Sequence, residues 1–454
     1  MKTNKFIISI IIVTLWSCEK SIDVDFPNTQ IDVTQVFETV STADGALSNL
    51  YAEMYSFSVL NGGTAGSGAL LGSYTDDLNC YMAASLGGAP DIFNNQQLPS
   101  NSVIKNSWAN SYKQIYLANS IITGVDASSG IATKDKNRIK GEALFLRSLI
   151  YFYLTQIFGD VPYTTTTDFT INQKIGKMND KEVLTTIHND LMLSIDLLDD
   201  NYRNTDRIYP NKKAAEMMLA IVCMQENKWS QAENLLKDIK SNSLYAWEPD
   251  VSKTFKKSGK HILWQFKPLQ ANLPTNEVSM YYFTTAAPTG YALSSDLVNA
   301  FETSDLRFQK WITKITVNQN VFYRCNKYVN AVNNSDEYSI VFRMEEVNLL
   351  LAEALVRQNR KEEALPLLNA VRQKAGNSNL GPLSNEQILE ELLNENRREF
   401  FAEKGNRFLT LKRFGRLDQL NAVKPNWQNF HKVWPIPLND LLLNPNLNPQ
   451  NPGY

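Results

Sequence analysis

The sequence predicts a mainly α fold in which paired helices form one large domain with a loop-rich, partly irregular β face. Three observations lead to this prediction. Long segments repeat apolar residues every three or four positions, as amphipathic helices do. A helix–turn–helix segment occurs twice, at residues 218–236 and 350–368. Between the helical blocks lie stretches rich in Gly, Ser and Pro with short apolar runs, which favour loops and short strands.

The first element is the apolar stretch FIISIIIVTLW at residues 6–16, which two lysines precede. It is shorter than the roughly 18 apolar residues that a membrane-spanning helix needs, and its basic start is typical of a secretory signal. Leu15, three residues before Cys18, resembles part of a bacterial lipobox. This resemblance implies a lipoprotein signal peptide at residues 1–17, its removal, and lipid attachment at Cys18. The alternative is an ordinary signal peptide followed by an incidental cysteine.

The charge and cysteine content exclude several classes of protein. Without the two signal-peptide lysines, 43 basic residues remain against 47 acidic ones, so the formal charge is near −4. Such a chain has no global field that would hold nucleic acid. The other cysteines, Cys80, Cys223 and Cys325, are widely spaced, so we expect neither a disulfide framework nor a zinc site. No metal or cofactor is predicted, and Cys223 is expected in the core.

Three long segments are predicted to be helices. Residues 102–125 carry one apolar stripe, which places Trp108 and Tyr116 in the core. Residues 137–162 are apolar on more than one face, so that helix should be central and covered on both sides. Residues 179–198 begin with Asn179 or Asp180 as the predicted N-cap and continue with an apolar repeat.

The internal repeat aligns residues 218–236 with residues 350–368 without gaps, at an offset of 132 residues. The identical pairs are Leu219/Leu351, Ala220/Ala352, Asn227/Asn359, Ala232/Ala364, Leu235/Leu367 and Leu236/Leu368. Each copy predicts a helix, a polar turn around an Asn, and a second helix whose Ala permits close packing, as in tetratricopeptide hairpins. The copies are not in tandem, so we expect dispersed hairpins. Pro366 should bend its helix or mark a later start.

The chain is predicted to divide after the signal into an N-terminal helical half (18–240), a loop-rich region (241–340), and C-terminal helices with an extended tail (341–454). The segment GGTAGSGAL at residues 62–70 lacks the Lys of a phosphate loop and predicts a flexible loop. The runs KHILWQFKP and NVFYRCNKYV predict strands of a small, irregular sheet. The tail, rich in Pro and Asn, should follow the surface in an extended path.

Charged side chains in the C-terminal part are interpreted as structural. Five of them lie close enough on one predicted helix to pair locally, at about 0.2–0.5 kcal/mol each. They are Arg397, Arg398, Glu399, Glu403 and Lys404. If Arg147 or Arg407 is buried, we expect it to hold a loop carbonyl or carboxylate in place.

Four segments match, in order, the motifs of one known family. They are GEALFLRSLIYFYLTQIFGDVPY (141–163), RMEEVNLLLAEALVRQNRKEEALPLLNAVR (343–372), NENRREFFAEKGNRFLTLKRFG (394–415) and VWPIPLNDLLLNPNLNPQNPGY (433–454). Together with the lipobox they resemble the SusD/RagB family, outer-membrane nutrient-binding lipoproteins of Bacteroidetes. The resemblance implies a SusD-like domain over residues 18–454 with four tetratricopeptide-like helix pairs.

The same resemblance implies a function. Such a protein captures an oligosaccharide or similar nutrient at the cell surface and passes it to a SusC-like TonB-dependent transporter. It is held by its lipid at the outer membrane and faces the exterior. Two alternatives remain open: a surface glycan-degrading enzyme, and a helical scaffold that binds peptides or proteins.

Candidate ligand contacts are loop aromatics with polar neighbours, because sugar rings stack on exposed aromatic rings while amides and carboxylates bind hydroxyls. The candidates are Tyr74, Asp76, Asp77, Asn79, Tyr81, Trp247, Tyr291 and Trp311. The competing interpretation is that a loop aromatic covers the core.

Catalytic motifs are not recognisable in the sequence. Its three histidines are not in an HExxH motif, and no G-x-S-x-G elbow is present. Asp76 and Asp77 are adjacent, whereas the two carboxylates of a glycosidase lie about 5–10 Å apart across a cleft. The sequence therefore predicts binding without catalysis.

Overall fold

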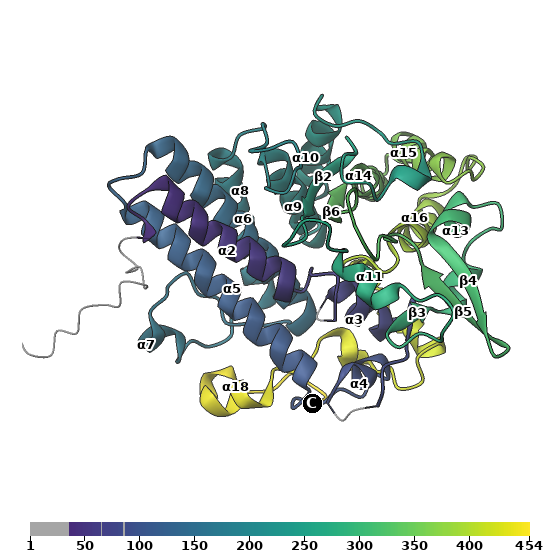
Figure 1. The fold of residues 1–454 in the computed structure, drawn as a ribbon, viewed down its shortest axis with the longest axis horizontal. Helices are drawn as coiled ribbons and strands as arrows, with labels where there is room; N and C mark the ends of the chain where they lie inside the picture. Colours follow the sequence, from purple (N-terminus) through teal and green to yellow (C-terminus); the bar gives the residue numbers. More distant parts are fainter. Residues whose placement is uncertain (1–35, 65, 85–86) are drawn as a thin grey trace, which may run out of the picture.

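The computed structural model describes residues 36–64, 66–84 and 87–454, so Cys18 and the predicted signal peptide lie outside the described residues. Helices dominate the described part, which confirms the predicted mainly α fold (Figure 1). The long helices are α2 (Val40–Phe57), α5 (Ser102–Ala127), α6 (Thr133–Phe158), α8 (Asp180–Leu197), α9 (Lys212–Gln225), α10 (Trp229–Ser241), α14 (Met344–Arg357), α15 (Lys361–Lys374) and α16 (Asn385–Phe400).

The long helices form a stack of pairs. Within the described residues α2 packs on α5, α6 on α8, α9 on α10, and α14 on α15. Neighbouring pairs join because α5 also packs on α6, α8 on α9, and α10 on α14. Figure 1 shows this stack running from α2 and α5 on the left to α15 on the right. This is the arrangement of four tetratricopeptide-like pairs that the family resemblance implies.

The two copies of the internal repeat form equivalent hairpins, α9–α10 and α14–α15. Asn227 and Asn359 occupy the same place in the two turns, with φ of 60° and 61°. Asn tolerates this left-handed conformation better than most residues, which explains an Asn at both turns. Pro366 lies inside α15, which begins at Lys361, so it does not mark a later helix start.

Helix α6 is central, as its sequence predicts. Nearly every residue from Ile139 to Phe158 is buried, and the helix ends at Gly159 with φ of 76°. On the neighbouring α5, Trp108 is buried as expected, but Tyr116 is 51% exposed, so its predicted core position is wrong. The apolar stripe of α5 is narrower than the sequence suggests, because Tyr116 lies at its solvent-facing edge.

The strands form two small antiparallel sheets. A four-stranded sheet has the order β1-β3-β5-β4, and a two-stranded sheet pairs β2 with β6. The strands are β1 (Leu78–Cys80), β2 (Ile262–Phe266), β3 (Tyr291–Leu293), β4 (Ile312–Val317), β5 (Asn320–Cys325) and β6 (Ser339–Arg343). In Figure 1 the larger sheet lies at the right-hand side, away from α5 and α8. The predicted strand runs of the loop-rich region are present.

The glycine-rich segment expected to be a flexible loop is partly a buried helix, α3 (Ser67–Tyr74). Small residues make this packing possible. A Cβ on Gly68 would lie 2.6 Å from the carbonyl oxygen of Ala402, which is closer than real Cβ contacts come. The absence of a side chain at Gly68 therefore lets α3 pack closely against the backbone at Ala402, which is far away in sequence.

The remaining described helices are short and lie in the connections between the long helices and in the C-terminal part. They are α4 (Ala89–Phe93), α7 (Phe169–Asn172), α11 (Asn276–Tyr281), α12 (Ser295–Asn299), α13 (Leu306–Trp311), α17 (Asn406–Arg413) and α18 (Leu438–Leu443), with 3-10 turns at Val251–Lys253, Leu417–Ala422, Asn429–Lys432 and Pro445–Leu447. The tail holds no long helix, as predicted, but it is not extended throughout, because α18 and a 3-10 turn interrupt it, and it caps α6. The backbone N–H of Trp434 donates to the carbonyl of Ile157 at 2.7 Å, and the side-chain amide of Asn451 donates to that of Phe158 at 2.7 Å. None of the described helices has the length and apolar character to cross a membrane.

Candidate functional site

Aromatic side chains gather on the outward side of the four-stranded sheet. Tyr81 follows β1, Phe322 lies on β5, and Tyr282 and Phe283 follow α11. The ring of Phe322 meets the Tyr81 ring with centroids 5.4 Å apart and the Phe283 ring at 6.4 Å, both edge-on. Together with Arg324 these four residues form a cluster that we call the aromatic face.

The alternation of β5 explains why these side chains point outward. Successive strand residues point to opposite sides of a sheet, so Phe322 and Arg324 share one side and Cys325 the other. Cys325 is buried, which identifies its side as the core side. On the first strand Leu78 is buried, so Asn79 and Tyr81 point the opposite way. The Tyr81 N–H donates to Gly290 at 2.8 Å, which continues the β1–β3 pairing.

Arg324 holds the aromatic face in shape. Its guanidinium carbon lies 4.5 Å from the centroid of the Tyr282 ring. Its Nη1 donates to the carbonyl of Phe283 at 2.8 Å, and its Nε donates to Oδ1 of Asn326 at 2.6 Å. Tyr81 and Tyr282 remain 38% and 36% exposed. The cluster therefore offers fixed but accessible ring surfaces beside a positive charge.

A polar cavity of about 500 Å³ has Asn79 of β1 in its wall, two residues before Tyr81. Its lining includes the amides of Asn94 and Asn426 and the carboxylate of Asp296. Lys424 lies in its wall, where Nζ donates to the carbonyl of Ser73 at 2.8 Å. Burial lowers the pKa of Lys424 to about 8. A polyhydroxylated ligand needs aromatic rings for its C–H surfaces and amides or carboxylates for its hydroxyl groups. The aromatic face offers the rings, and the cavity offers the amides.

Three of the predicted ligand aromatics are core residues instead. Tyr74 is fully buried, and its hydroxyl donates to the carbonyl of His431 at 2.9 Å. Tyr291 is fully buried on the core side of β3. Trp311 is buried, and its indole N–H donates to the carbonyl of Val251 at 3.1 Å. Their assignment as exposed platforms is wrong, because long-range packing covers these loop segments.

The two predicted acidic contacts are also structural. The Asp76 carboxylate accepts hydrogen bonds from Nε and Nη2 of Arg407, and the Asp77 carboxylate accepts one from Nε of Arg397. All three are 2.8 Å long. Burial opposes the charge on Asp76, but hydrogen bonds from Arg407 and the two positive charges outweigh it and lower its pKa. For Asp77 burial dominates and raises the pKa despite the nearby Arg397. Because arginines occupy both carboxylates, neither is free to bind a ligand.

Arg407 thus holds a loop carboxylate, as the sequence predicts for a buried arginine. Arg147 is also buried, but its carboxylate partner lies on a helix and not in a loop, since its Nη2 donates to Asp190 of α8 at 2.7 Å. The prediction that the five charged side chains between Arg397 and Lys404 pair with one another along one helix is wrong for most of them. Glu399 pairs with Arg307 at 2.9 Å, and Lys404 with Glu346 at 2.8 Å, both on other segments. These charges tie elements together across the C-terminal part.

Of the remaining predicted contacts, Asn79 and Tyr81 belong to the site described above. Trp247 does not belong to the aromatic face: it is partly buried against the core, with Nζ of Lys374 on α15 5.7 Å from its ring centroid. Phe322 and Arg324 were missed by sequence reasoning. Their signal was present in the alternation of the predicted strand NVFYRCNKYV, but the sequence does not show which side faces the core.

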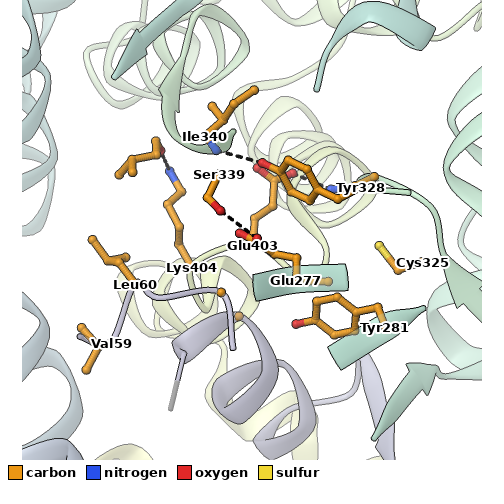
Figure 2. Close-up of a pocket in the computed structure, with 15 residues that line it drawn as sticks. Val59, Leu60, Glu277, Tyr281, Cys325, Tyr328, Ser339, Ile340, Glu403 and Lys404 are labelled. Carbon is orange, nitrogen blue, oxygen red and sulfur yellow. Dashed lines mark hydrogen bonds and ion pairs between the residues drawn. The ribbon is translucent and has the colours of Figure 1, made fainter. Parts of the chain in front are cut away.

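A smaller cavity of about 30 Å³ lies within the core and is shown in Figure 2. Its lining includes Glu277, Tyr281, Glu403 and Lys404. Oγ of Ser339 donates to Oε2 of Glu277 at 2.8 Å. Burial raises the pKa of Glu277 to about 7. The volume is about that of one water molecule in the liquid, so this cavity is too small for a sugar ring.

A third hollow, of about 500 Å³, lies between α5, α7 and α18. It is more apolar, and it includes the exposed rings of Tyr116 and Phe169. The Asn172 side chain in its wall already has partners: Oδ1 accepts from the Thr164 hydroxyl at 2.6 Å, and Nδ2 donates to the carbonyl of Thr166 at 2.9 Å. The aromatic face, with its amide-lined cavity, is therefore the better candidate site.

Comparisons with known proteins agree with this architecture. A family model described as "Starch-binding associating with outer membrane" matches residues 25–224, and a model described as "SusD family" matches residues 281–454. The chain is 24% identical over 420 residues to SusD-like protein P25 of Formosa agariphila, covering 77% of this chain and 80% of that protein.

Solved structures share the fold. A SusD superfamily protein from Bacteroides vulgatus superposes with a TM-score of 0.79 at 20% identity, over 91% of this chain and 99% of that one. Surface glycan-binding protein A from Bacteroides thetaiotaomicron, solved in complex with laminarihexaose, superposes with a TM-score of 0.76 at 17% identity over the same shares. With two family models that together span most of its length, the chain belongs to the SusD/RagB family of outer-membrane-associated binding proteins.

Proposed function

We propose that this chain is a cell-surface lipoprotein that captures an oligosaccharide on its aromatic face without altering it chemically. The observation that carries the proposal is the cluster of partly exposed rings around Phe322, which Arg324 fixes, with Asn79 on the adjacent strand segment in the wall of an amide-lined cavity. The ring edges and faces suit the apolar C–H surfaces of a sugar. Asn79 and its neighbours suit the hydroxyl groups.

The comparisons support a carbohydrate as the ligand. One matching family model is described as starch-binding, and one structural neighbour was solved with laminarihexaose. A peptide-binding scaffold would use a helical groove, whereas the accessible rings of this site lie on a small sheet and on the turn after α11.

The open shape of the site predicts weak binding. A partly exposed platform leaves much of a ligand in water, so we expect dissociation constants in the micromolar to millimolar range, about −4 to −8 kcal/mol. Weak binding suits a protein that captures a nutrient and then releases it to a partner.

A titration of purified protein with laminarihexaose and a panel of other oligosaccharides tests this proposal, read out by calorimetry. We expect at least one glycan to bind in the stated range, with no new reducing ends after prolonged incubation. If reducing ends accumulate, the protein is a glycan-degrading enzyme. If no glycan binds, the ligand is of another class.

We also propose that the signal peptide 1–17 is removed and that Cys18 carries the lipid anchor at the outer membrane. More than one acyl chain gives stable anchoring, whereas a single chain gives only marginal binding. In cell fractionation, the parent should enter the outer-membrane and detergent phases, and Cys18→Ser should not. A parent protein found only in the aqueous phase would contradict this proposal.

The partner that receives the ligand is proposed to be a SusC-like TonB-dependent transporter. A lid that opens and closes repeatedly needs a large preformed interface, well above about 1,000 Å². Affinity purification of the lipidated protein from its native membrane should recover such a transporter. Recovery of the protein alone under mild detergent would argue against the complex.

A further inference from the structure

Three side chains of metal-ligating type meet between α8 and α9. Figure 1 shows these two helices away from the strands β3, β5 and β4. His188 lies on α8, Cys223 lies in the last turn of α9, and Glu226 follows as the C-terminal cap of α9. One ligand atom from each lies within 4.8 Å of the others. Nδ1 of His188 is 2.7 Å from Oε2 of Glu226 and 4.0 Å from Sγ of Cys223.

We propose that His188, Cys223 and Glu226 bind a divalent metal ion of the zinc class, with water in the fourth position. Zinc prefers imidazole nitrogen, thiolate and carboxylate oxygen at about 2.0–2.3 Å in tetrahedral geometry. Those bond lengths place ligand atoms roughly 3.3–3.8 Å apart. The observed spacings bracket this range, so small side-chain rotations suffice to complete the site.

The electrostatics of the cluster also suit a dication. A carboxylate and a thiolate together carry two negative charges, which match the charge of the ion. Burial raises the pKa of the Cys223 thiol to about 12, so coordination must displace its proton to solvent. Lys228 lies 3.0 Å from Oε1 of Glu226 and 3.4 Å from Nδ1 of His188. Its side chain is 43% exposed, so it can turn toward water when the ion enters.

A supporting residue orients the imidazole. The side-chain amide nitrogen of Gln231 lies 3.2 Å from Nε2 of His188, so in the metal-free arrangement the amide donates to the ring. When the ion binds, a half-turn of the amide places its oxygen there to accept the Nε2 hydrogen, which leaves Nδ1 as the free ligand atom. Ligating histidines in metal sites generally make such a contact through their second nitrogen.

The internal repeat shows that the hairpin itself does not need these residues. At the offset of 132 residues, Cys223 aligns with Leu355 and Glu226 aligns with Gln358. The second hairpin folds in the same way with these other residues, including the left-handed turn. A fold requirement therefore does not explain a thiol and a carboxylate at these two positions.

No metal site was expected from the sequence, because the ligands do not lie in one short motif. His188 and Cys223 are 35 residues apart and come from consecutive long helices. An ion bound here would cross-link α8 to α9 and so connect the helix pair α6–α8 to the pair α9–α10.

Cobalt(II) titration of purified, tag-free protein tests the proposal. Co²⁺ replaces Zn²⁺ in such sites, and a Co²⁺–thiolate bond gives a charge-transfer band in the near ultraviolet. We expect this band in the parent, its loss on Zn²⁺ addition, and its loss in Cys223→Ser. Cys80→Ser and Cys325→Ser are matched controls that should keep it.

Two further variants separate metal binding from folding. Glu226→Gln places the residue of the sister hairpin at this position, and its circular dichroism should match the parent while its Co²⁺ affinity falls. Gln231→Ala should weaken Co²⁺ binding by about 10–100-fold. Absence of the band in the folded parent, or its persistence in Cys223→Ser, would overturn the proposal.

Discussion

Arg407 forms a bidentate ion pair with Asp76, in which Nε and Nη2 each lie 2.8 Å from one carboxylate oxygen. The pair joins α17 to the segment after α3, which is 331 residues away in sequence. Both side chains are largely buried. The contact therefore fixes the segment that leads into β1 and Tyr81.

Loss of this pair should destabilise the protein strongly. Arg407→Ala leaves a buried carboxylate without its main partner, which costs about 3–5 kcal/mol. Arg416→Ala is the control, because Arg416 faces Glu390 at 3.8 Å with both side chains about half exposed, and such pairs contribute little. Urea unfolding should separate the two variants. Equal midpoints would show that the buried pair is not a structural tie.

The turn of the first hairpin depends on a residue that tolerates positive φ. Asn227 has φ of 60°, and Ala there costs about 1–2 kcal/mol whereas Gly does not. We therefore expect Asn227→Ala to lower the free energy of unfolding by about that amount and Asn227→Gly to leave it nearly unchanged. Equal effects of Ala and Gly in chemical denaturation would mean that the Asn side chain itself, and not its backbone conformation, matters.

Glu277 should make stability depend on pH. Burial raises its pKa from 4.5 to about 7, so the folded state holds this proton more tightly than the unfolded state. The contribution of Glu277 is complete below pH 4.5 and is lost as the pH rises through 7. Glu277→Gln mimics the protonated form, so its stability relative to the parent should grow by roughly 2 kcal/mol between pH 5 and pH 8.

Urea unfolding at the two pH values measures this difference. Glu302→Gln is the control, because the Glu302 side chain is 66% exposed and its variant should stay within about 0.5 kcal/mol of the parent throughout. A constant offset between Glu277→Gln and the parent at both pH values would show that Glu277 is ionised in the folded protein.

The helical part of the fold could be predicted from the sequence because its signals are local. Apolar spacing marked the central helix ending at Phe158, and the repeated Asn227 and Asn359 marked the hairpin turns. Such signals arise within about twenty residues, so one sequence suffices to detect them.

The site could be predicted only in part, because burial in loop regions depends on distant segments. Tyr74 is covered by the tail, where its hydroxyl bonds to His431, 357 residues further on. Nothing near Tyr74 in the sequence distinguishes it from Tyr81, which stays accessible. Phe322 was missed for a different reason: its strand was predicted, but only the burial of Cys325 in the folded protein shows which side of β5 faces the core.

The most direct test of glycan capture compares substitutions of rings on the aromatic face with substitution of an exposed ring elsewhere. Calorimetry with the best-binding oligosaccharide of the panel should show affinity about tenfold weaker for Phe322→Ala and for Tyr81→Ala, or ~1.4 kcal/mol each. Phe169→Ala, which removes a ring that is 73% exposed on α7, should bind like the parent. Full affinity in a folded double variant of Tyr81 and Phe322 would contradict the account.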